Sequence, residues 1–454
     1  MSADERRAAF SLAAIFSFRM LGLFMILPVM ALHARTLGEV DPMLIGLAIG
    51  VYGLTQALLA IPYGMLSDRF GRKPVIAAGL LVFAAGSVAA AMADTITGII
   101  IGRALQGGGA VAAAVMALAA DLTREEHRTR TMAIIGMTIG LSFALSMALG
   151  PLLNRWIGVP GIFWLTAVLA LVGIAILYLM VPNTQAGHSR RDTGAMPAEF
   201  RVVLRNAQLL RLNVGVFVLH CALTATFVAL PFALHDYVGL DVDHHGYLYL
   251  PVLLVSLVAM VPLVVIAEKK RRLKGVFLLA IATLGVAELV LLGFYGSLAG
   301  IAVALLLFFL AFNVLEALLP SLLVKFTPAD KKGSAMGLFS SSQFIGAFAG
   351  GVLGGWLYGR FGMSGVFGGV LILICVWLLW ARTMASPPYL ASYMIYVGQF
   401  TERAQAERTR ELLAVPGVAE AVIVADEGVA YLKVDSRTVD RAHIDELAQR
   451  WRAE

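Results

Sequence analysis

Residues 64–74 have the sequence Gly-Met-Leu-Ser-Asp-Arg-Phe-Gly-Arg-Lys-Pro and connect two apolar runs that are each long enough to cross a bilayer. Asp68, Arg69, Arg72 and Lys73 crowd into this short connection. A segment that only joined two helices would need neither these charges nor the glycine at position 71. The stretch therefore predicts a charged hinge between membrane helices, in a protein whose parts move.

The composition of the whole chain is that of a membrane protein. Of its 454 residues, 59% are hydrophobic and 14% are charged, and the mean hydropathy is +0.84. A soluble domain has about 25% charged residues. Because lipid offers the backbone no hydrogen bonds, the long apolar runs are predicted to be helices. We expect about twelve spans, numbered here as helices 1 to 12 in chain order. They lie near residues 10–33, 43–66, 74–93, 96–119, 130–151, 161–181, 210–234, 246–267, 275–294, 298–320, 334–357 and 364–382.

Basic residues are unevenly distributed over the connections between these spans. They concentrate at the N-terminus and in every second connection, whereas the other connections hold only Arg35, Arg155 and Arg360. Basic loops stay on the cytoplasmic side, so we predict that both termini are cytoplasmic, in the inner membrane of a bacterium. The formal net charge of +6 is thus a topology signal. We do not predict nucleic-acid binding, because the bases form no single stripe.

The chain repeats itself at an offset of about 200 residues. Leu27-Pro28 is followed by Ala-Leu-His, and so is Leu230-Pro231. An offset of 200 also pairs charged and small residues: Asp68 with Glu268, Arg72 with Arg272, and Gly150 with Gly350. This constant offset predicts two six-helix halves in parallel repeat. In the second copy of the charged loop the glycines are lost, since Val264 and Arg271 stand in their places.

The repeat and the composition together predict four parts of the chain. An N-terminal half covers residues 1–181, a polar cytoplasmic linker covers 182–209, and a C-terminal half covers 210–383. After Pro387 and Pro388 the composition becomes that of a soluble domain, which covers 389–454.

These features resemble the major facilitator superfamily over about residues 8–383. Residues 64–73 match the family signature of the connection between helices 2 and 3. Helix 4 carries Arg103 and Gln106 in a run that resembles the motif of proton-linked members. Helix 5 carries Gly140, Gly150 and Pro151, which partly match the motif of antiporters. The resemblance implies the major facilitator fold of twelve transmembrane helices and points to the drug–proton antiporter branch.

In that family the signature loop holds the outward-open state, so the resemblance implies a conformational latch. We expect Arg72 to pair with Asp121 and Asp68 to approach the N-terminus of helix 11, where an anion is favoured. Loss of Asp68 would then populate the inward-facing state. The alternative is that these charges only fix topology. The latch residues are predicted to be Gly64, Asp68, Arg69, Gly71, Arg72 and Asp121.

Helices 1, 4, 7 and 10 line the central cavity in this superfamily, and each carries one ionisable residue at membrane depth. Such residues are costly in lipid and usually mark a pathway. Glu316 is the candidate proton carrier, ahead of Glu288, because helix 9 does not line the cavity. Arg19 has the alternative of snorkelling toward the interface, and His220 that of a packing residue. The candidate proton and substrate pathway is Arg19, Arg103, Gln106, His220, Asn313 and Glu316.

The amide side chains and the apolar lining leave two further alternatives open. Gln106 and Asn313 could bind substrate, or they could form hydrogen bonds between helices. Phenylalanine and methionine residues on helices 1 and 10 would suit greasy cations, or they could simply face lipid and neighbouring helices.

The segment 389–454 has the pattern β-α-β-β-α, which predicts a small ferredoxin-like α+β domain. The run Val-Pro-Gly-Val at 415–418 resembles heavy-metal-associated domains. Their metal loop needs Cys-x-x-Cys, whereas residues 398–403 offer no soft ligand, so we predict no metal site. The pattern predicts an open sheet edge for a partner, a second copy, or the transporter's own cytoplasmic face.

The sequence thus predicts a monomeric secondary active transporter that exchanges protons for small, largely apolar or drug-like substrates by alternating access. The proton gradient would be its energy source, and no cofactor is expected. Neither a Walker phosphate loop nor a catalytic constellation is present, so we do not predict an enzyme. The alternatives are a transporter-fold sensor or receptor that signals through the C-terminal domain, and a proton symporter for a small metabolite.

Overall fold

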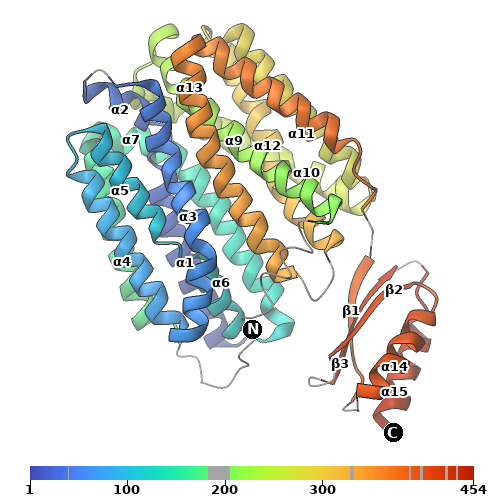
Figure 1. The fold of residues 1–454 in the computed structure, drawn as a ribbon. Coiled ribbons are helices and arrows are strands. Elements are labelled where there is room, and N and C mark those ends of the chain that lie inside the picture. The colour runs from blue at the N-terminus through green and yellow to red at the C-terminus, as the bar shows by residue number, and fades with distance from the viewer. Residues whose placement is uncertain are drawn as a thin grey trace.

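The computed structural model describes residues 1–38, 40–182, 205–327, 332–387, 390–398, 402–424, 428–435 and 438–453. Most of the predicted linker, residues 183–204, lies outside this range. Two groups of helices lie side by side, and a small domain with strands lies at one end of them (Figure 1). The two groups agree with the two helical halves that the sequence predicts.

Seven helices form the N-terminal half and five helices with two short turns form the C-terminal half in the described part of the chain. The first half comprises α1 (Ala3–Phe24), α2 (Met30–Thr36), α3 (Pro42–Phe70), α4 (Arg72–Ala91), α5 (Ile96–Gly108), α6 (Ala112–Asp121) and α7 (Glu125–Leu179). The second comprises α9 (Ala207–Phe232), the π-turn η1 (Ala233–Tyr237), the 3-10 turn η2 (Val242–His244), α10 (His245–Lys269), α11 (Leu273–Phe294), α12 (Leu298–Phe326) and α13 (Lys332–Ala381).

Ten helical segments among the described residues are long and apolar enough to span a membrane. Two of them, in α7 and α13, are far longer than the roughly 20 residues that a span needs. Each contains a glycine with positive φ, Gly158 (φ 67°) and Gly362 (φ 63°), where the helical geometry fails. If each holds two spans, the described chain has the twelve that the sequence predicts.

Contacts with α1 show that the chain reverses direction at Gly158. Before this glycine, Ser142 bonds to Ser17 and Ser146 bonds to the carbonyl of Leu21, so both helices advance together. After it, Thr166 lies against Gly22, whereas the later Leu179 meets the earlier Arg7. Residues 125–157 are therefore parallel to α1, and residues 160–179 are antiparallel to it.

Two predicted spans are interrupted, and both interruptions have a local cause. The span expected at 10–33 breaks between α1 and α2, beside Pro28, which has no N–H to continue the helix. The matching Pro231 precedes the π-turn η1 in the second half. The span expected at 96–119 breaks between α5 and α6, at Gly109, where a Cβ would lie 2.4 Å from the carbonyl oxygen of Gly79. The glycines of the span 96–119 thus allow backbones to approach closely, and the helix is interrupted there.

The C-terminal domain consists of β1 (Leu390–Tyr396), α14 (Glu402–Ala414), β2 (Val418–Val424), β3 (Val429–Asp435) and α15 (Arg441–Ala453). Its sheet is antiparallel with the order β1-β3-β2, which is the order of these strands in a ferredoxin-like fold. Both helices lie on one face of the sheet (Figure 1), and Trp451 and Leu412 are buried in its core. The predicted β-α-β-β-α domain is confirmed.

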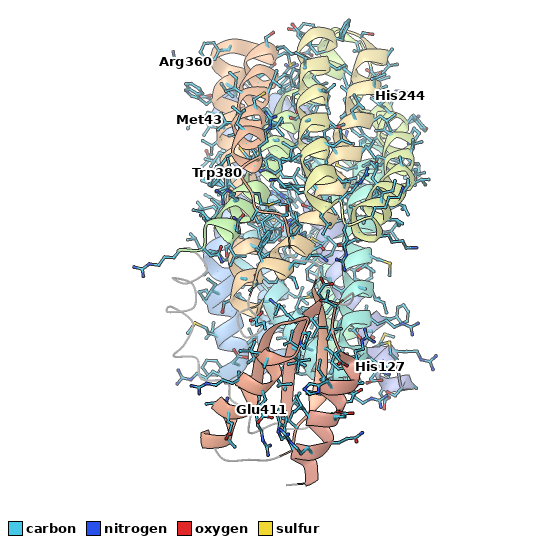
Figure 2. The ribbon with its side chains drawn as sticks, turned by 90° about the vertical axis from the view of Figure 1, so that its right-hand side faces the viewer. Met43, His127, His244, Arg360, Trp380 and Glu411 are labelled. Atoms are coloured by element: carbon cyan, nitrogen blue, oxygen red, sulfur yellow. The ribbon has the colours of Figure 1, made fainter. Side chains whose placement is uncertain are left out.

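The two ends of the helical bundle can be told apart by the domain. His127 lies at the end that carries the C-terminal domain, which is marked by Glu411, whereas Met43, His244 and Arg360 lie at the opposite end (Figure 2). We refer to these as the domain end and the far end.

Candidate functional site

The charged loop 64–74 is folded onto its own half. Gly71 has φ of 93°, so it supplies the backbone conformation that lets α3 end and α4 begin without a longer connection. Arg72 contacts Asp68 at 2.5 Å and donates from Nε to Asp121 Oδ2 at 3.0 Å. The next residue, Lys73, donates to the carbonyl oxygen of Val181 at 2.6 Å. Arg72 thus joins the ends of α3 and α6, which is the Arg72–Asp121 contact that the sequence suggests.

The remaining latch residues lie around this arginine. Arg72 also donates to Ser67 Oγ at 2.7 Å, and Arg69 lies over the ring of Phe70 at 5.3 Å. The nearest atom to a Cβ built on Gly64 would be Cβ of Ala113, at 3.8 Å, in the same half. The described contacts of the latch therefore stay within the N-terminal half. The approach of Asp68 to the N-terminus of the eleventh predicted span, residues 334–357 in α13, stays a prediction for another state of the protein.

Helices α3 and α13 hold the two halves together toward the far end. A Cβ on Gly46 would lie 1.9 Å from the carbonyl oxygen of Gly351, and one on Gly53 would lie 2.4 Å from that of Phe344. Toward the domain end, a Cβ on Gly337 would meet no described atom within 4 Å. The tight glycine contact thus covers the far-end part of these helices, and it fixes where the halves touch.

The hydrophobic cores show the same division. One cluster contains residues of both halves, such as Met147 and Phe309, and includes the far-end residues Met30 and Ala34. A second cluster, which includes Leu12 and Leu118, contains residues of the N-terminal half alone. In the described part of the chain, the halves are therefore packed together at the far end and packed separately at the domain end.

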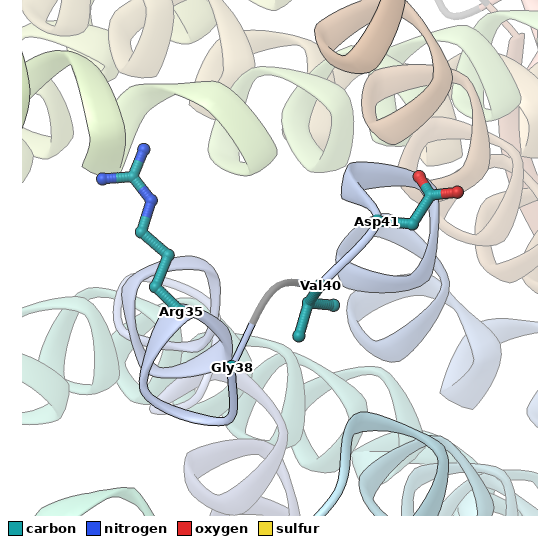
Figure 3. Close-up of a pocket in the computed structure, with 4 residues that line it drawn as sticks. All are labelled: Arg35, Gly38, Val40 and Asp41. Carbon is teal, nitrogen blue, oxygen red and sulfur yellow. The ribbon is translucent and has the colours of Figure 1, made fainter.

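An ion pair also joins the halves at the far end. The guanidinium of Arg35 in α2 donates to both carboxylate oxygens of Asp236 in η1, at 2.8 and 2.7 Å. The same guanidinium lies 4.0 Å from the ring centroid of Phe232. Arg35 also lines a hollow with Gly38, Val40 and Asp41 (Figure 3). This hollow lies between α2 and α3, apart from the predicted pathway residues.

Arg19 and Arg103 are brought together around one tyrosine. Tyr52 is 2% exposed, and its ring centroid lies 5.9 Å from Cζ of Arg19 and 5.2 Å from Cζ of Arg103. Arg19 donates to the Tyr52 hydroxyl at 2.7 Å and to Oε1 of Gln56. With 2% of its surface exposed, Arg19 does not snorkel.

Gln106 completes the arginine cluster on the side of Arg103. Its Oε1 accepts from Arg103 at 3.1 Å, and its Nε2 donates to Ser87 at 2.8 Å. Arg103 donates further to the carbonyl oxygens of Ala48 and Ile49. The motif that contains Arg103 and Gln106 thus connects α5 to α3 and α4.

His220 and Glu316 form a second group, in the C-terminal half. His220 Nδ1 lies 3.1 Å from the carbonyl oxygen of Val216, so hydrogen bonding assigns the proton to Nδ1. Nε2 can then accept from Gln343, at 2.8 Å. Oε1 of Glu316 lies 3.6 Å from the same Nε2, and its side chain is 37% exposed although Leu315 and Leu318 beside it are buried. A proton added to Nε2 would exchange the Gln343 contact for an ion pair with Glu316.

The other predicted residues lie apart from these two groups. Asn313 donates to Ser256 at 3.1 Å, so it joins α12 to α10. In the helix 5 motif, a Cβ on Gly150 would lie 2.4 Å from the carbonyl oxygen of Met25, whereas one on Gly140 would meet no described atom within 4 Å. Pro151 follows Gly150 inside α7. Gly150 thus permits close packing of α7 on α1.

The second copy of the charged loop contacts the C-terminal domain. Arg271 keeps positive φ (52°) although it is not a glycine, and its NH2 lies 3.3 Å from Oδ1 of Asp435. Lys433 donates to the carbonyl oxygen of Thr327 at 2.6 Å. Within the second half, Glu268 accepts from Ser321 at 2.7 Å and from Lys325 at 3.2 Å. This loop therefore connects α10 and α12 to β3.

Three of these features are missing from the sequence-based prediction. Tyr52 stands in a glycine-rich helix, and the only signal for it is a polar aromatic group between Gly50 and Gly53. The pairs Arg35–Asp236 and Arg271–Asp435 join distant segments, so no local pattern indicates them. Arg35 and Asp236 lie in corresponding parts of the repeat, which is the one signal that a comparison of the halves provides.

Comparison with known proteins gives the same assignment. The chain matches the family described as Major Facilitator Superfamily over residues 12–351 and 212–393, and the YajR YAM domain over residues 401–450. It is 47% identical over 446 residues to the inner membrane transport protein YajR of Escherichia coli K12, covering 98% of both chains. An uncharacterized transporter of Buchnera aphidicola is 34% identical over 76% of this chain and 89% of its own.

A solved structure with the same fold is a bacterial homolog of the human lysosomal transporter Spinster in an inward-facing and occupied conformation. It aligns with a TM-score of 0.70 at 13% identity and covers 84% of this chain and 97% of its own. The family match and the YajR relative carry the assignment of function. The chain belongs to the major facilitator superfamily and is a multi-pass transporter of the inner membrane, similar to YajR.

Proposed function

We propose that this transporter is a proton-coupled exporter that exchanges protons for small, largely apolar molecules by alternating access. The described parts of the predicted basic connections lie at the domain end, so the positive-inside rule favours a cytoplasmic domain end and cytoplasmic termini. The halves touch at the far end through Arg35 and Asp236 and through the glycines of α3 and α13. The arrangement fits an inward-facing state, with the far end closed.

The observation that carries the coupling to protons is the group formed by Glu316, His220 and Gln343. A carboxyl group and an imidazole 3.6 Å apart can hold one, two or no protons between them. The partial exposure of Glu316, in a helix whose neighbouring residues are buried, favours access from a water-filled space. Because Gln343 belongs to α13 and His220 to α9, protonation would alter a contact between two helices.

Everted membrane vesicles test the proposal. Lactate respiration acidifies their interior, and a pH-sensitive dye reports whether an added compound releases protons again. Compounds are chosen by comparing growth inhibition in cells that lack or overexpress the protein. We expect proton release with the wild type and at least about a tenfold lower rate with Glu316→Gln.

The control is Glu446→Gln, because Glu446 is an exposed acid of α15, whose side chain is 78% exposed. It should release protons at the wild-type rate. An unchanged rate with Glu316→Gln would contradict the role of Glu316. Entry of the compound into the vesicles while protons leave them would support export, because the cytoplasmic face of everted vesicles is outside. Movement of the compound in the same direction as the protons would favour the symporter alternative.

The contact between the C-terminal domain and the bundle favours a second candidate, a transporter-fold sensor. Lys433 binds the backbone of Thr327 at the end of α12, so a movement of α12 would reach β3 directly. A sensor would bind its ligand without substrate-dependent proton flux. The vesicle experiment therefore separates the two candidates.

A further inference from the structure

Two guanidinium groups are buried in the N-terminal half, and no described carboxylate pairs with either of them. Arg19 is 2% exposed and Arg103 is 3% exposed, and both lie beside Tyr52. Among the described residues, neither arginine forms an ion pair. The acids described inside the membrane, Glu288 and Glu316, belong to α11 and α12 in the other half. Two buried charges of the same sign are unfavourable unless an opposite charge joins them.

The hydrogen bonds distinguish the two arginines. Arg103 donates to Gln106 and to two backbone carbonyls, so neutral acceptors surround it. Arg19 uses NH2 for Tyr52 and Gln56, while its Nε and NH1 are buried with no acceptor. Nε2 of Gln56 is also buried without a partner. Three N–H donor groups thus lack acceptors around Arg19, and this donor set suits a carboxylate.

Aromatic rings surround the same guanidinium. Cζ of Arg19 lies 5.9 Å from the ring centroids of both Tyr52 and Phe83. The ring of Phe344, from α13 in the other half, lies 6.4 Å from that of Tyr52. An anion at Arg19 would therefore have apolar and aromatic surface beside it, at the contact between the halves.

Helix α13 connects this place to the proposed proton site. Phe344 contacts Tyr52 of the arginine cluster, and its chain neighbour Gln343 contacts His220. A ligand between Arg19 and Phe344 would thus contact α13, and the neighbouring Gln343 of the same helix contacts the imidazole of His220. Binding and protonation could then influence each other through one helix.

We propose that Arg19 binds the negatively charged end of the cargo, and that the cargo is an organic carboxylate with an aromatic or similarly apolar body. The proposal rests on the proposed transport function and names its substrate class. It differs from the expectation of greasy cations, which Arg19 and Arg103 would repel.

The test measures thermal unfolding of the full-length protein in detergent with three probes that share a naphthalene ring. The probes are 1-naphthoate, 1-naphthamide and 1-naphthylmethylammonium, in chloride-free sodium sulfate. A ligand that binds the folded state raises the melting temperature. We expect a rise with 1-naphthoate and none with the amide or the ammonium compound.

Variants then assign the effect to Arg19. Arg19→Gln should weaken 1-naphthoate binding by about ten- to a hundredfold, as expected for the loss of charge-assisted hydrogen bonds. Arg19→Lys keeps the positive charge but loses the planar guanidinium that can donate two parallel hydrogen bonds, so it should weaken binding less. Arg211→Gln is the matched control, because Arg211 lies at the start of α9 and contacts Thr383, and its binding should be unchanged. The probe series on the wild type decides the question even if Arg19→Gln does not fold.

Several outcomes would overturn the proposal. These are no stabilisation by 1-naphthoate, equal or greater stabilisation by the ammonium probe, and equal 1-naphthoate binding by wild type and Arg19→Gln. If sodium chloride alone stabilises the protein and 1-naphthoate adds nothing, the site holds an inorganic counter-ion only. The assay uses no proton gradient, so its failure is distinguishable from a failure of proton coupling.

Discussion

The two charged loops, 64–74 in the first half and 264–274 in the second, each contain a residue with positive φ but contact different parts of the molecule. Gly71 and Arg271, 200 positions apart, both have positive φ, at 93° and 52°. In the first loop Arg72 binds Asp121 of its own half. In the second loop Arg271 binds Asp435 of the C-terminal domain.

The acids at the corresponding positions 68 and 268 also have different partners. Asp68 contacts Arg72 within the loop, and its side chain is 47% exposed. Glu268 contacts Lys325 and Ser321 in α12, and position 321 corresponds to Asp121 of the first half. The repeat thus preserves the place of a helix-to-helix link while the charges that form it change.

This difference indicates a division of labour. The first loop leaves Asp68 available for a contact between the halves, whereas the second loop ties its half to the C-terminal domain. The duplicated unit thus supplies a docking point in the second half, and we propose that it supplies a latch in the first. Predictions that alter the same position in both loops can break or sharpen this comparison.

The largest effect is expected from Arg72→Gln compared with Arg272→Gln. Arg72 contacts Asp68, Asp121 and Ser67, so its loss should lower transport about tenfold, which corresponds to roughly 1–2 kcal/mol in the balance of states. Arg272 precedes α11, and its substitution should change transport by less than about twofold. Equal losses in the vesicle assay would show that the loops are equivalent.

A smaller effect is expected on stability when the positive-φ residues are changed. Gly71→Ala should destabilise the protein by about 1 kcal/mol, because a Cβ is strained at φ 93° and ψ 150°. Arg271→Gly relieves strain and loses a partly exposed ion pair, so its effect should stay within about 1 kcal/mol. Thermal unfolding in detergent measures both. Destabilisation of the two variants by the same amount would contradict the comparison.

The smallest effect is expected from Asp435→Asn, which removes the ion pair with Arg271 and leaves Lys433 bound to Thr327. The pair is about a third exposed, so the loss should be about 0–1 kcal/mol. Hydrogen exchange of β3 and of the end of α12 should rise slightly. The double variant with Lys433→Met should release the domain and raise exchange further. Unchanged exchange in the double variant would exclude this contact as the docking point.

Much of the architecture follows from the sequence because hydrophobic length and the 200-residue offset are local or periodic signals. The helices, the C-terminal β-α-β-β-α domain and the reversal near Gly158 belong to this part. The breaks at Pro28 and Gly109 were not predicted, because each depends on how closely neighbouring helices pack.

The site was only partly predictable for the same reason. Arg72 and Asp121 lie at ends of predicted helices on the same side of the membrane, whereas the importance of Tyr52 depends on two arginines from other helices. Likewise, the orphaned donors of Arg19 become visible only when every neighbouring acceptor is placed. Long-range pairs such as Arg35–Asp236 depend on tertiary structure and leave no local pattern.

The central claim is that Asp68 acts as a latch between the halves and that its counterpart Glu268 does not. Spin labels at positions 130 and 333, at the domain ends of α7 and α13, report the separation of the halves by pulsed electron resonance, with Cys221 and Cys375 replaced. We predict that Asp68→Asn removes the short-distance population and that Glu268→Gln leaves it unchanged. Equal shifts in both variants, or no shift with Asp68→Asn, would contradict the claim.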